Sequence, residues 1–211
     1  MKLEFGYGCG VQTVEVPEKN LLEVLTSNPV DHERRGEEAV RYALANPIGA
    51  PLLRDIVKKG KKIAIVTSDI SRPLPSYDVL PPVLEELFRA GVKAEDVTVV
   101  FALGSHRPHT REEMIALVGQ SVFDQVRCVD SDPNDCVHMG TTSAGTPVDI
   151  TRTVAEADFR ICLGNIEFHY FAGYSGGAKA IMPGVSTRAA IQANHSRMVD
   201  PAACAGAIGN N

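Results

Sequence analysis

Most side chains able to act as acids, bases or anion ligands fall in short segments that directly follow apolar, β-branched runs. These segments begin at Asp69, Gly104 and Gly164. Runs of this kind are typical of buried parallel strands, whose carboxyl ends meet at one edge of a sheet, where ligands bind. The segments would therefore bring carboxylate, guanidinium, imidazole and amine groups together: Asp69, Arg72, His106, His109, Glu167, His169 and Lys179.

Two histidines in these segments are candidates for proton transfer. His106 directly follows an apolar run, and His169 lies inside the aromatic stretch 168–171. An apolar, water-poor setting keeps imidazole neutral and able to accept a proton near pH 7, although it also suits an ordinary half-buried core histidine. His109 precedes a helix cap, where a role in the turn is as reasonable as a role in a site.

A glycine-rich turn at residues 173–177 precedes Lys179. Glycines let backbone N–H groups approach an anion closely, which indicates a phosphate contact. The turn is not a Walker A loop, because alanine flanks the lysine on both sides, and the turn after the first apolar run lacks the glycines of a dinucleotide fingerprint. A plain structural turn with a solvated lysine stays open as the alternative. The anion contacts expected here are Ser175, Gly176 and Gly177.

The same turn also matches the pattern G-x-S-x-G, in which Ser175 would be a nucleophile and His169 its base. In α/β-hydrolases that pattern needs a strand immediately before it and a helix immediately after it. Aromatic residues and a second glycine surround Ser175 here, so a hydrolase or transferase is a weak alternative.

His195 is the remaining candidate ligand. Pro183 and Gly184 stand between it and Lys179, so the two side chains would have to converge through a loop rather than along one helix. No second ligand stands near His195 at helical or turn spacing. One imidazole is far from a complete protein-only metal site.

Composition narrows the class of protein. Of the 211 residues, 44% are hydrophobic and 22% are charged, which is ordinary globular usage. The net charge of −5 removes the global basic field of a typical nucleic-acid binder, and no uninterrupted apolar stretch is long enough to span a membrane. Five cysteines without a C-x-x-C pair argue against a disulfide framework and a cysteine zinc site. We therefore expect a cytoplasmic protein without nucleic-acid or membrane partners.

The elements that would position these residues alternate between strands and helices. Apolar runs predict strands at 62–67, 97–103 and 157–163, with weaker strands at 126–129, 137–139 and 148–150, and a hairpin in the first 20 residues. Helical spacing predicts helices at 31–46 and 75–90, and a capping box at Thr110 predicts another. This order predicts an α/β fold: a doubly wound, mostly parallel, Rossmann-like sheet with helices on both faces. Without a visible linker, residues 1–211 are expected to form a single domain.

Four motifs in consistent order resemble the nickel-dependent lactate racemase family over about residues 45–200. They are Asp69-x-Ser71-Arg72-Pro73, Gly104-x-His106-Arg107-Pro108, Glu167-x-His169 running into Gly173-Tyr174-Ser175-Gly176-Gly177-x-Lys179, and Asn194-His195-Ser196. Members of that family carry a second domain of comparable size. The resemblance therefore implies that this chain is the N-terminal, cofactor-binding half, that the second domain is absent from it, and that this missing domain is its partner.

The family resemblance also implies a cofactor and residue roles. The cofactor is a nickel-pincer nucleotide, a pyridinium mononucleotide whose sulfur donors hold nickel, attached to a lysine through a thioamide. By motif, Lys179 would carry the cofactor and His195 would ligate nickel. Arg72 would hold the substrate, and Asp69 would contact the nucleotide. Ser175, Gly176 and Gly177 would meet the phosphate, and His106 and His169 would be the acid/base pair.

The implied reaction is racemisation or epimerisation of a small 2-hydroxy acid through a 2-keto intermediate. Each enantiomer needs its own base near neutral pKa, which two histidines supply. Ala178, Ala180 and Phe168 depart from what lactate-active relatives often carry, which leaves the choice of 2-hydroxy acid open. The alternative is a non-catalytic phosphate- or nucleotide-binding module of the same fold. We expect the isolated chain to fold but not to racemise, because hydride transfer requires a closed, dry site.

Overall fold

The computed structural model describes residues 1–209 and 211, which divide into two compact units, Met1–Glu33 and Arg34–Asn211. In the first unit, strands β1 (Lys2–Tyr7) and β2 (Gly10–Glu15) form the expected antiparallel hairpin, followed by the short 3-10 helix η1 (Glu18–Asn20). So short a segment rarely buries enough surface to fold alone. The expectation of a single domain over residues 1–211 stays a prediction.

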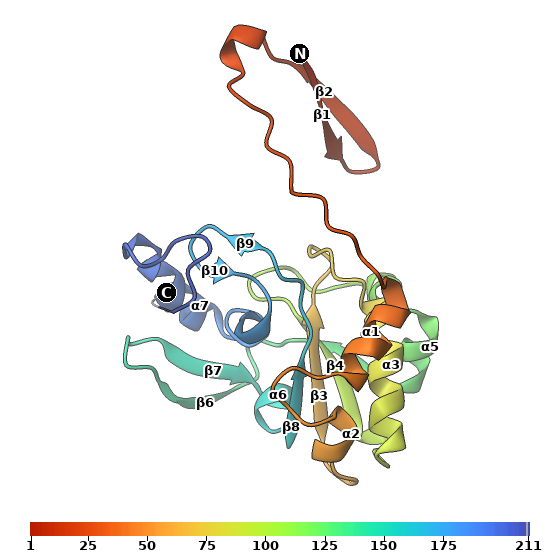
Figure 1. The fold of residues 1–211 in the computed structure, drawn as a ribbon. Helices are drawn as coiled ribbons and strands as arrows, with labels where there is room; N and C mark the ends of the chain where they lie inside the picture. The colour runs from red at the N-terminus through yellow and green to blue at the C-terminus, as the bar shows by residue number, and fades with distance from the viewer. Residues whose placement is uncertain (210) are drawn as a thin grey trace. The chain divides into compact units, whose positions relative to one another are not determined.

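The second unit is built on a four-stranded sheet in which all strands are parallel, in the order β5-β4-β3-β8 (Figure 1). The chain runs from β3 through β4 to β5 and then returns to place β8 on the opposite side of β3. This reversal creates a topological switch point between β3 and β8, where ligands bind in open α/β sheets. The strands are β3 (Ile63–Ser68), β4 (Val97–Ala102), β5 (Arg127–Asp130) and β8 (Phe159–Cys162).

Alternate residues of the central strands face two separate cores. Ile63 and Ile65 of β3 pack with the helices on one face, and Ala64 and Val66 pack into the other core, all of them almost fully buried. Figure 1 shows α1, α3 and α5 on the first side of the sheet. The helices of this unit are α1 (Gly36–Ala45), α2 (Leu53–Ile56), α3 (Ser76–Arg89), η2 (Ala94–Asp96), α4 (Arg111–Val118), α5 (Gln120–Gln125) and α6 (Arg152–Ala155).

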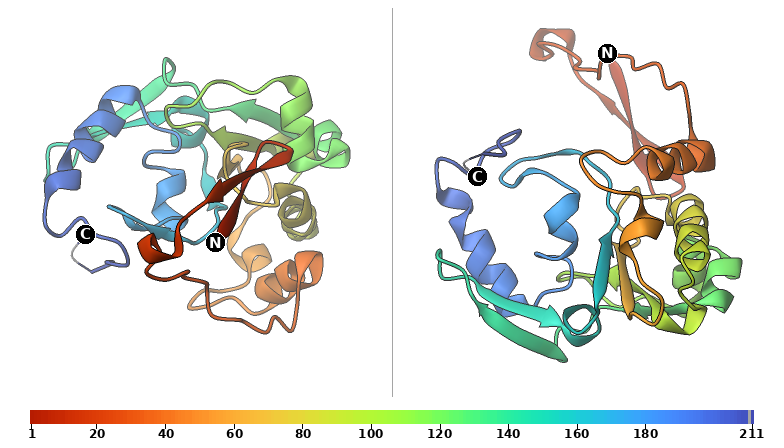
Figure 2. Two further views of the ribbon diagram at one scale, coloured as in Figure 1. Left: turned by 90° about the horizontal axis from the view of Figure 1, so that it is seen from above. Right: turned by 60° about the horizontal axis from the view of Figure 1, so that its bottom comes forward.

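The second face is covered by α6, a hairpin and the C-terminal segments. The weak strands expected near 137–139 and 148–150 are present, but they pair with each other outside the sheet, so the main sheet is entirely rather than mostly parallel. Figure 2 shows α7 beside this hairpin, where the Thr187 backbone N–H donates to the Asp149 carbonyl at 3.3 Å. The elements are β6 (Cys136–Thr141), β7 (Pro147–Thr151), β9 (Phe168–His169), β10 (Gly173–Tyr174), η3 (Gly177–Ala180), α7 (Arg188–His195) and η4 (Ser196–Val199).

The predicted α/β architecture, with helices on both faces of the sheet, is confirmed. The capping box at Thr110 is also confirmed: its side chain accepts from the Glu113 backbone N–H, while the Glu113 carboxylate accepts from the Thr110 N–H. Within the residues that the structure describes, no helix combines the length and apolar character needed to cross a bilayer.

Gly184 closes the floor between the sheet and η3. Its carbonyl accepts from the Gly104 backbone N–H at 2.8 Å, and a Cβ at this position would lie 2.8 Å from Ala102 Cβ and collide with the Ala180 carbonyl. We expect Gly184→Ala to lower the free energy of unfolding by about 2 kcal/mol or more, because the added methyl group overpacks a backbone contact. Urea unfolding measures this change. Gly6→Ala is the control, since open space surrounds Gly6, and an equal loss in both variants would contradict the argument.

Candidate functional site

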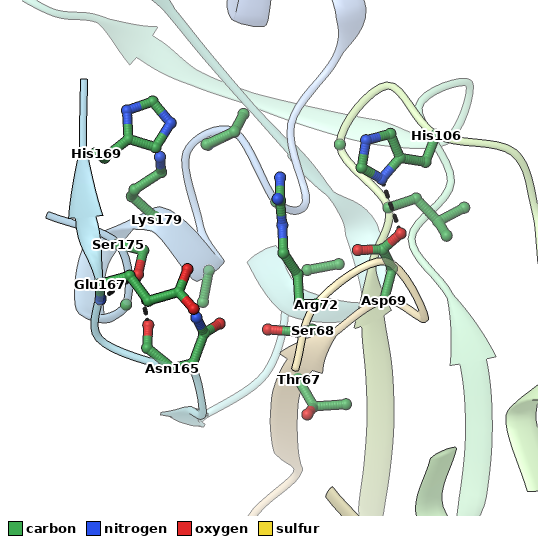
Figure 3. A pocket seen from close by; sticks show the side chains of 18 of the residues that line it. Thr67, Ser68, Asp69, Arg72, His106, Asn165, Glu167, His169, Ser175 and Lys179 are labelled. Carbon is green, nitrogen blue, oxygen red and sulfur yellow. Dashed lines mark hydrogen bonds and ion pairs between the residues drawn. The ribbon is translucent and has the colours of Figure 1, made fainter. Parts of the chain in front are cut away.

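A cavity of about 270 Å³ opens at the carboxyl ends of β3, β4 and β8, at the switch point of the sheet (Figure 3). The loop after each of these strands contributes to its lining, which is why residues far apart in sequence meet there. Gly177 is the one predicted site residue outside the lining. The predicted residues that line the cavity are Asp69, Arg72, His106, His169, Ser175, Gly176, Lys179 and His195.

Asp69 and His106 form a close pair on one side of the cavity (Figure 3). His106 Nδ1 lies 2.7 Å from Asp69 Oδ2, and Ser71 Oγ donates to Asp69 Oδ1 at 2.9 Å. The Asp69 side chain is only 5% exposed, whereas that of His106 is 43% exposed. A buried carboxylate bonded to Nδ1 holds the imidazole proton there and leaves Nε2 with a free lone pair, as in catalytic dyads. Sequence analysis did not predict this pairing, and contact of Asp69 with a nucleotide stays a prediction.

His169 is held differently. Its Nδ1 accepts the backbone N–H groups of Phe171 and Ala172 at 3.4 and 3.2 Å, so a neutral ring carries its proton on Nε2. Burial lowers the pKa of His169 below its usual value of 6.5, and the positive charges of Lys179, Arg72 and His195 lower it further. The ring is therefore neutral at pH 7, as its aromatic surroundings led us to expect.

Arg72 and Lys179 bring positive charge to the cavity. Figure 3 shows Arg72 between the Asp69–His106 pair and Lys179. In the described part of the chain, neither Arg72 nor Lys179 makes an ion pair. Burial lowers the pKa of Lys179 below its usual 10.5, and Arg72 lowers it further. The cavity thus offers two uncompensated cations to an anion, and one of them is an amine with enhanced nucleophilic character.

This electrostatic arrangement predicts a measurable coupling between Lys179 and His169. We expect Lys179→Gln to raise the pKa of His169 toward 6.5, because the substitution removes a nearby positive charge that disfavours the imidazolium. An NMR titration of the His169 ring protons measures the shift. Lys61→Gln serves as the control, since Lys61 is paired with Asp158 outside this cavity. An unchanged or lower His169 pKa in Lys179→Gln would contradict the assignment.

The glycine-rich turn is shaped by a close crossing of two loops. Gly176 has φ of +79°, and a Cβ on Gly164 would lie 3.1 Å from Gly176 Cα, so neither position tolerates a side chain easily. Ser175 fastens the same crossing: its Oγ donates to the Asn165 carbonyl at 2.7 Å and accepts the Glu167 N–H at 2.8 Å. Contact of this turn with a phosphate stays a prediction.

The Ser175 geometry speaks against a serine nucleophile. The hydroxyl proton is directed at a backbone carbonyl, and the described contacts include no hydrogen bond between Ser175 and His169. The preceding strand, β10, has two residues and lies outside the main sheet. An α/β-hydrolase nucleophile instead sits at the end of a sheet strand.

Two buried polar atoms in the lining have no protein partner. Within residues 1–209 and 211, Asn165 Nδ2 and His195 Nδ1 are the buried side-chain nitrogen and oxygen atoms that lack a hydrogen bond, and both residues line this cavity. Buried polar atoms are normally paired, so two orphans in one cavity indicate groups that await a ligand. Sequence analysis did not single out Asn165, because an amide after a strand carries no signal of burial.

His195 and Lys179 converge through the loop between η3 and α7, as expected. Both residues also line a second cavity, of about 570 Å³, on the hairpin side. Among the described residues no group of three or more His, Cys, Asp or Glu side chains could hold a metal. A metal bound at His195 would therefore take most of its donors from a non-protein source.

Comparison with known protein families gives one match that covers most of the chain. Residues 7–206 match the family described as "Lactate racemase N-terminal domain". Lactate racemase from Thermoanaerobacterium thermosaccharolyticum is 35% identical over 216 residues, covering 99% of this chain and 50% of the relative. Lactate racemase from Lactiplantibacillus plantarum is 33% identical over 199 residues, covering 92% of this chain and 47% of the relative. The chain thus spans about half the length of these curated relatives.

Solved structures agree with this match. The lactate racemase apoprotein from Thermoanaerobacterium thermosaccharolyticum superposes with a TM-score of 0.82 at 34% identity, over 100% of this chain and 50% of that one. A Thermotoga maritima protein has a TM-score of 0.67 at 22% identity, covering 86% of this chain and 46% of that one. The second likeness concerns the fold alone.

Proposed function

The chain belongs to the lactate racemase N-terminal domain family, and from this premise we propose that it is the cofactor-binding half of a 2-hydroxy-acid racemase or epimerase. The observation that carries the proposal is the cavity at the switch point, where two unpartnered buried nitrogens, an unpaired lysine of lowered pKa and a histidine–aspartate pair face the same space. Its substrate would be a small 2-hydroxy acid.

The residues present fit a nickel-pincer nucleotide. His195 would hold the nickel, since its Nδ1 has no partner within the described chain and a single protein ligand suffices when the cofactor brings its own donors. Lys179 would carry the covalent attachment, because a lowered amine pKa enlarges the neutral, nucleophilic fraction. The unpartnered Asn165 amide would donate to an oxygen of the bound group or the substrate. When bound, such a cofactor supplies the acceptor for the hydride that leaves C2 of the substrate.

The chain's own residues would orient the substrate and move its hydroxyl proton. Arg72 would hold the substrate carboxylate, because guanidinium pairs well with carboxylate and this one has no ion pair in the described chain. His106 would accept the hydroxyl proton at Nε2 as the C2–H bond breaks. Asp69 would then stabilise the resulting imidazolium through Nδ1.

His169 would enter the reaction on different terms. A second base would have to accept a proton at the nitrogen facing the substrate, but the lone pair of His169 is taken up by two backbone N–H groups at Nδ1. In this arrangement His169 offers an Nε2–H donor to a substrate oxygen. Acting as a base requires the 169–172 loop to release Nδ1. The acid/base pair expected from the family resemblance is therefore unequal in this chain.

The test is co-expression of the chain with cofactor-biosynthesis proteins, followed by metal analysis and intact mass. We expect retained nickel and a mass increment that peptide mapping assigns to Lys179. An unmodified chain without nickel, in an experiment where a full-length lactate racemase is loaded, would overturn the proposal.

A second candidate is a binding module that holds a phosphorylated nucleotide or plain anion without chemistry of its own. The two unpaired cations, Arg72 and Lys179, favour it. Thermal shifts with unmodified mononucleotides distinguish the two functions. Strong stabilisation that survives in Lys179→Ala would favour the binding module over the racemase half.

A further inference from the structure

One loop supplies two histidine–aspartate pairs to neighbouring strands. The loop between β4 and α4 contains His106 and His109, three residues apart. His106 pairs with Asp69, which follows β3, while His109 pairs with Asp130, the last residue of β5, with 2.6 Å between His109 Nδ1 and Asp130 Oδ1. Since β3 and β5 flank β4 in the sheet, the loop is bonded to both neighbours of its own strand.

The His109 ring is buried, and both of its nitrogens are bonded. Its side chain is 1% exposed and packs edge-on against Phe101, with ring centroids 5.2 Å apart. Nε2 accepts the backbone N–H of Ile70 at 3.1 Å, which requires a lone pair there and places the ring proton on Nδ1, toward Asp130. Asp130 also accepts the His109 backbone N–H at 2.8 Å. Protein contacts therefore specify one tautomer.

The Ile70 N–H belongs to the peptide bond that joins Asp69 to Ile70. His109 thus fixes the plane of the peptide group directly attached to Asp69, whose carboxylate orients His106. We propose that His109 and Asp130 are positioning residues: they hold the Asp69–Ile70 peptide so that Asp69 meets His106 Nδ1. The catalytic meaning of this positioning rests on the proposed function, whereas the positioning itself does not.

Asp130→Asn tests the proposal with little change of shape. Asp130 accepts hydrogen bonds from two donors, the backbone N–H and the ring Nδ1–H of His109, and an amide has only one acceptor for them. Either a donor is left facing the amide NH₂, or the ring proton moves to Nε2 and opposes the Ile70 N–H. Both outcomes disturb the Asp69–Ile70 peptide.

The readout is the state of the His106 ring, measured by NMR of the ¹⁵N-labelled 211-residue chain. We expect Asp130→Asn to shift the Ile70 amide and the His106 ring nitrogens. We also expect the His106 Nδ1–H to exchange at least about tenfold faster, a ratio equivalent to about 1.4 kcal/mol. Asp149→Asn is the matched control, since Asp149 makes a 2.6 Å pair with His138 on the β6–β7 hairpin, and it should leave His106 unchanged.

Two results would overturn the proposal. One is a folded Asp130→Asn chain with native His106 and Ile70 signals, since a purely structural pair would lower stability without altering the His106 ring. The other needs no variant: in the native chain, a His109 ring protonated on Nε2 would remove the bond to Ile70 on which the argument depends. Because neither measurement involves nickel or turnover, their failure is separate from failure of the proposed function.

Discussion

A chain in which alanine replaces Lys179 is expected to carry no covalent cofactor and to lose the nickel that the native chain retains after co-expression with cofactor-biosynthesis proteins. The amine is the group that a thioamide link requires, and Lys179 combines a pKa lowered by burial with a place in the cavity lining beside His169. Intact mass spectrometry measures the adduct, and elemental analysis measures the metal. We expect complete loss of the adduct, because no neighbouring side chain can replace the amine.

Two matched variants separate attachment from charge. Lys179→Arg keeps a cation near Arg72 but removes the acylatable amine, so it should lose the adduct as fully as alanine does. Lys93→Ala removes an exposed lysine paired with Glu95 and should keep both adduct and nickel. An adduct that persists in Lys179→Ala, or that maps to another lysine, would show that the attachment point is wrong.

The second large effect concerns turnover. We expect the cofactor-loaded 211-residue chain to interconvert D- and L-lactate, or larger 2-hydroxy acids, at least about 10²-fold more slowly than a loaded full-length relative, because small errors of alignment have effects of that size. The cavity rim carries large apolar side chains in solvent: Ile166 is 78% exposed, Phe168 76% and Tyr170 70%. A rim of this kind implies a cover that excludes water during hydride transfer. Chiral chromatography of the hydroxy acids measures the rate.

The comparison needs a control for the length of the chain. The chain spans about half of the Thermoanaerobacterium thermosaccharolyticum lactate racemase, so that enzyme can be truncated to the matching span and assayed beside it. The truncated relative should lose activity to a similar degree. Turnover by the 211-residue chain close to that of the intact relative would show that the cavity is sufficient by itself.

The strands of the sheet were predictable because β-branched, apolar runs have few other stable solutions in a chain of this size. The runs at 62–67, 97–103 and 157–163 correspond to β3, β4 and β8. Helix boundaries were less predictable: α1 begins at Gly36 rather than at residue 31, and the short helix expected after Pro51 is a single turn, Leu53–Ile56. Local patterns determine which element forms more firmly than they determine where it starts.

The contacts within the site were less accessible from sequence. Grouping the strand ends brought Asp69, His106, His169 and Lys179 to one edge correctly, because parallel strands share their carboxyl edge. The partner of each side chain depends on strand order, which a single sequence does not encode locally. Asp130 meets His109 only because β5 lies next to β4, and the acceptor role of His169 Nδ1 depends on the backbone path of the 169–172 loop.

The order of the strands gives the two walls of the cavity different resistance to local opening. One wall rests on β3 and β4, which pair over six residues at the centre of the sheet, while the other begins at β8, an edge strand paired with β3 over four. Backbone amides of β3 and β4 should therefore exchange with deuterium only through global unfolding, whereas those from Gly164 onward should exchange through cheaper, partial openings. A bulky group could enter from the β8 side while the Asp69–His106 wall stays folded.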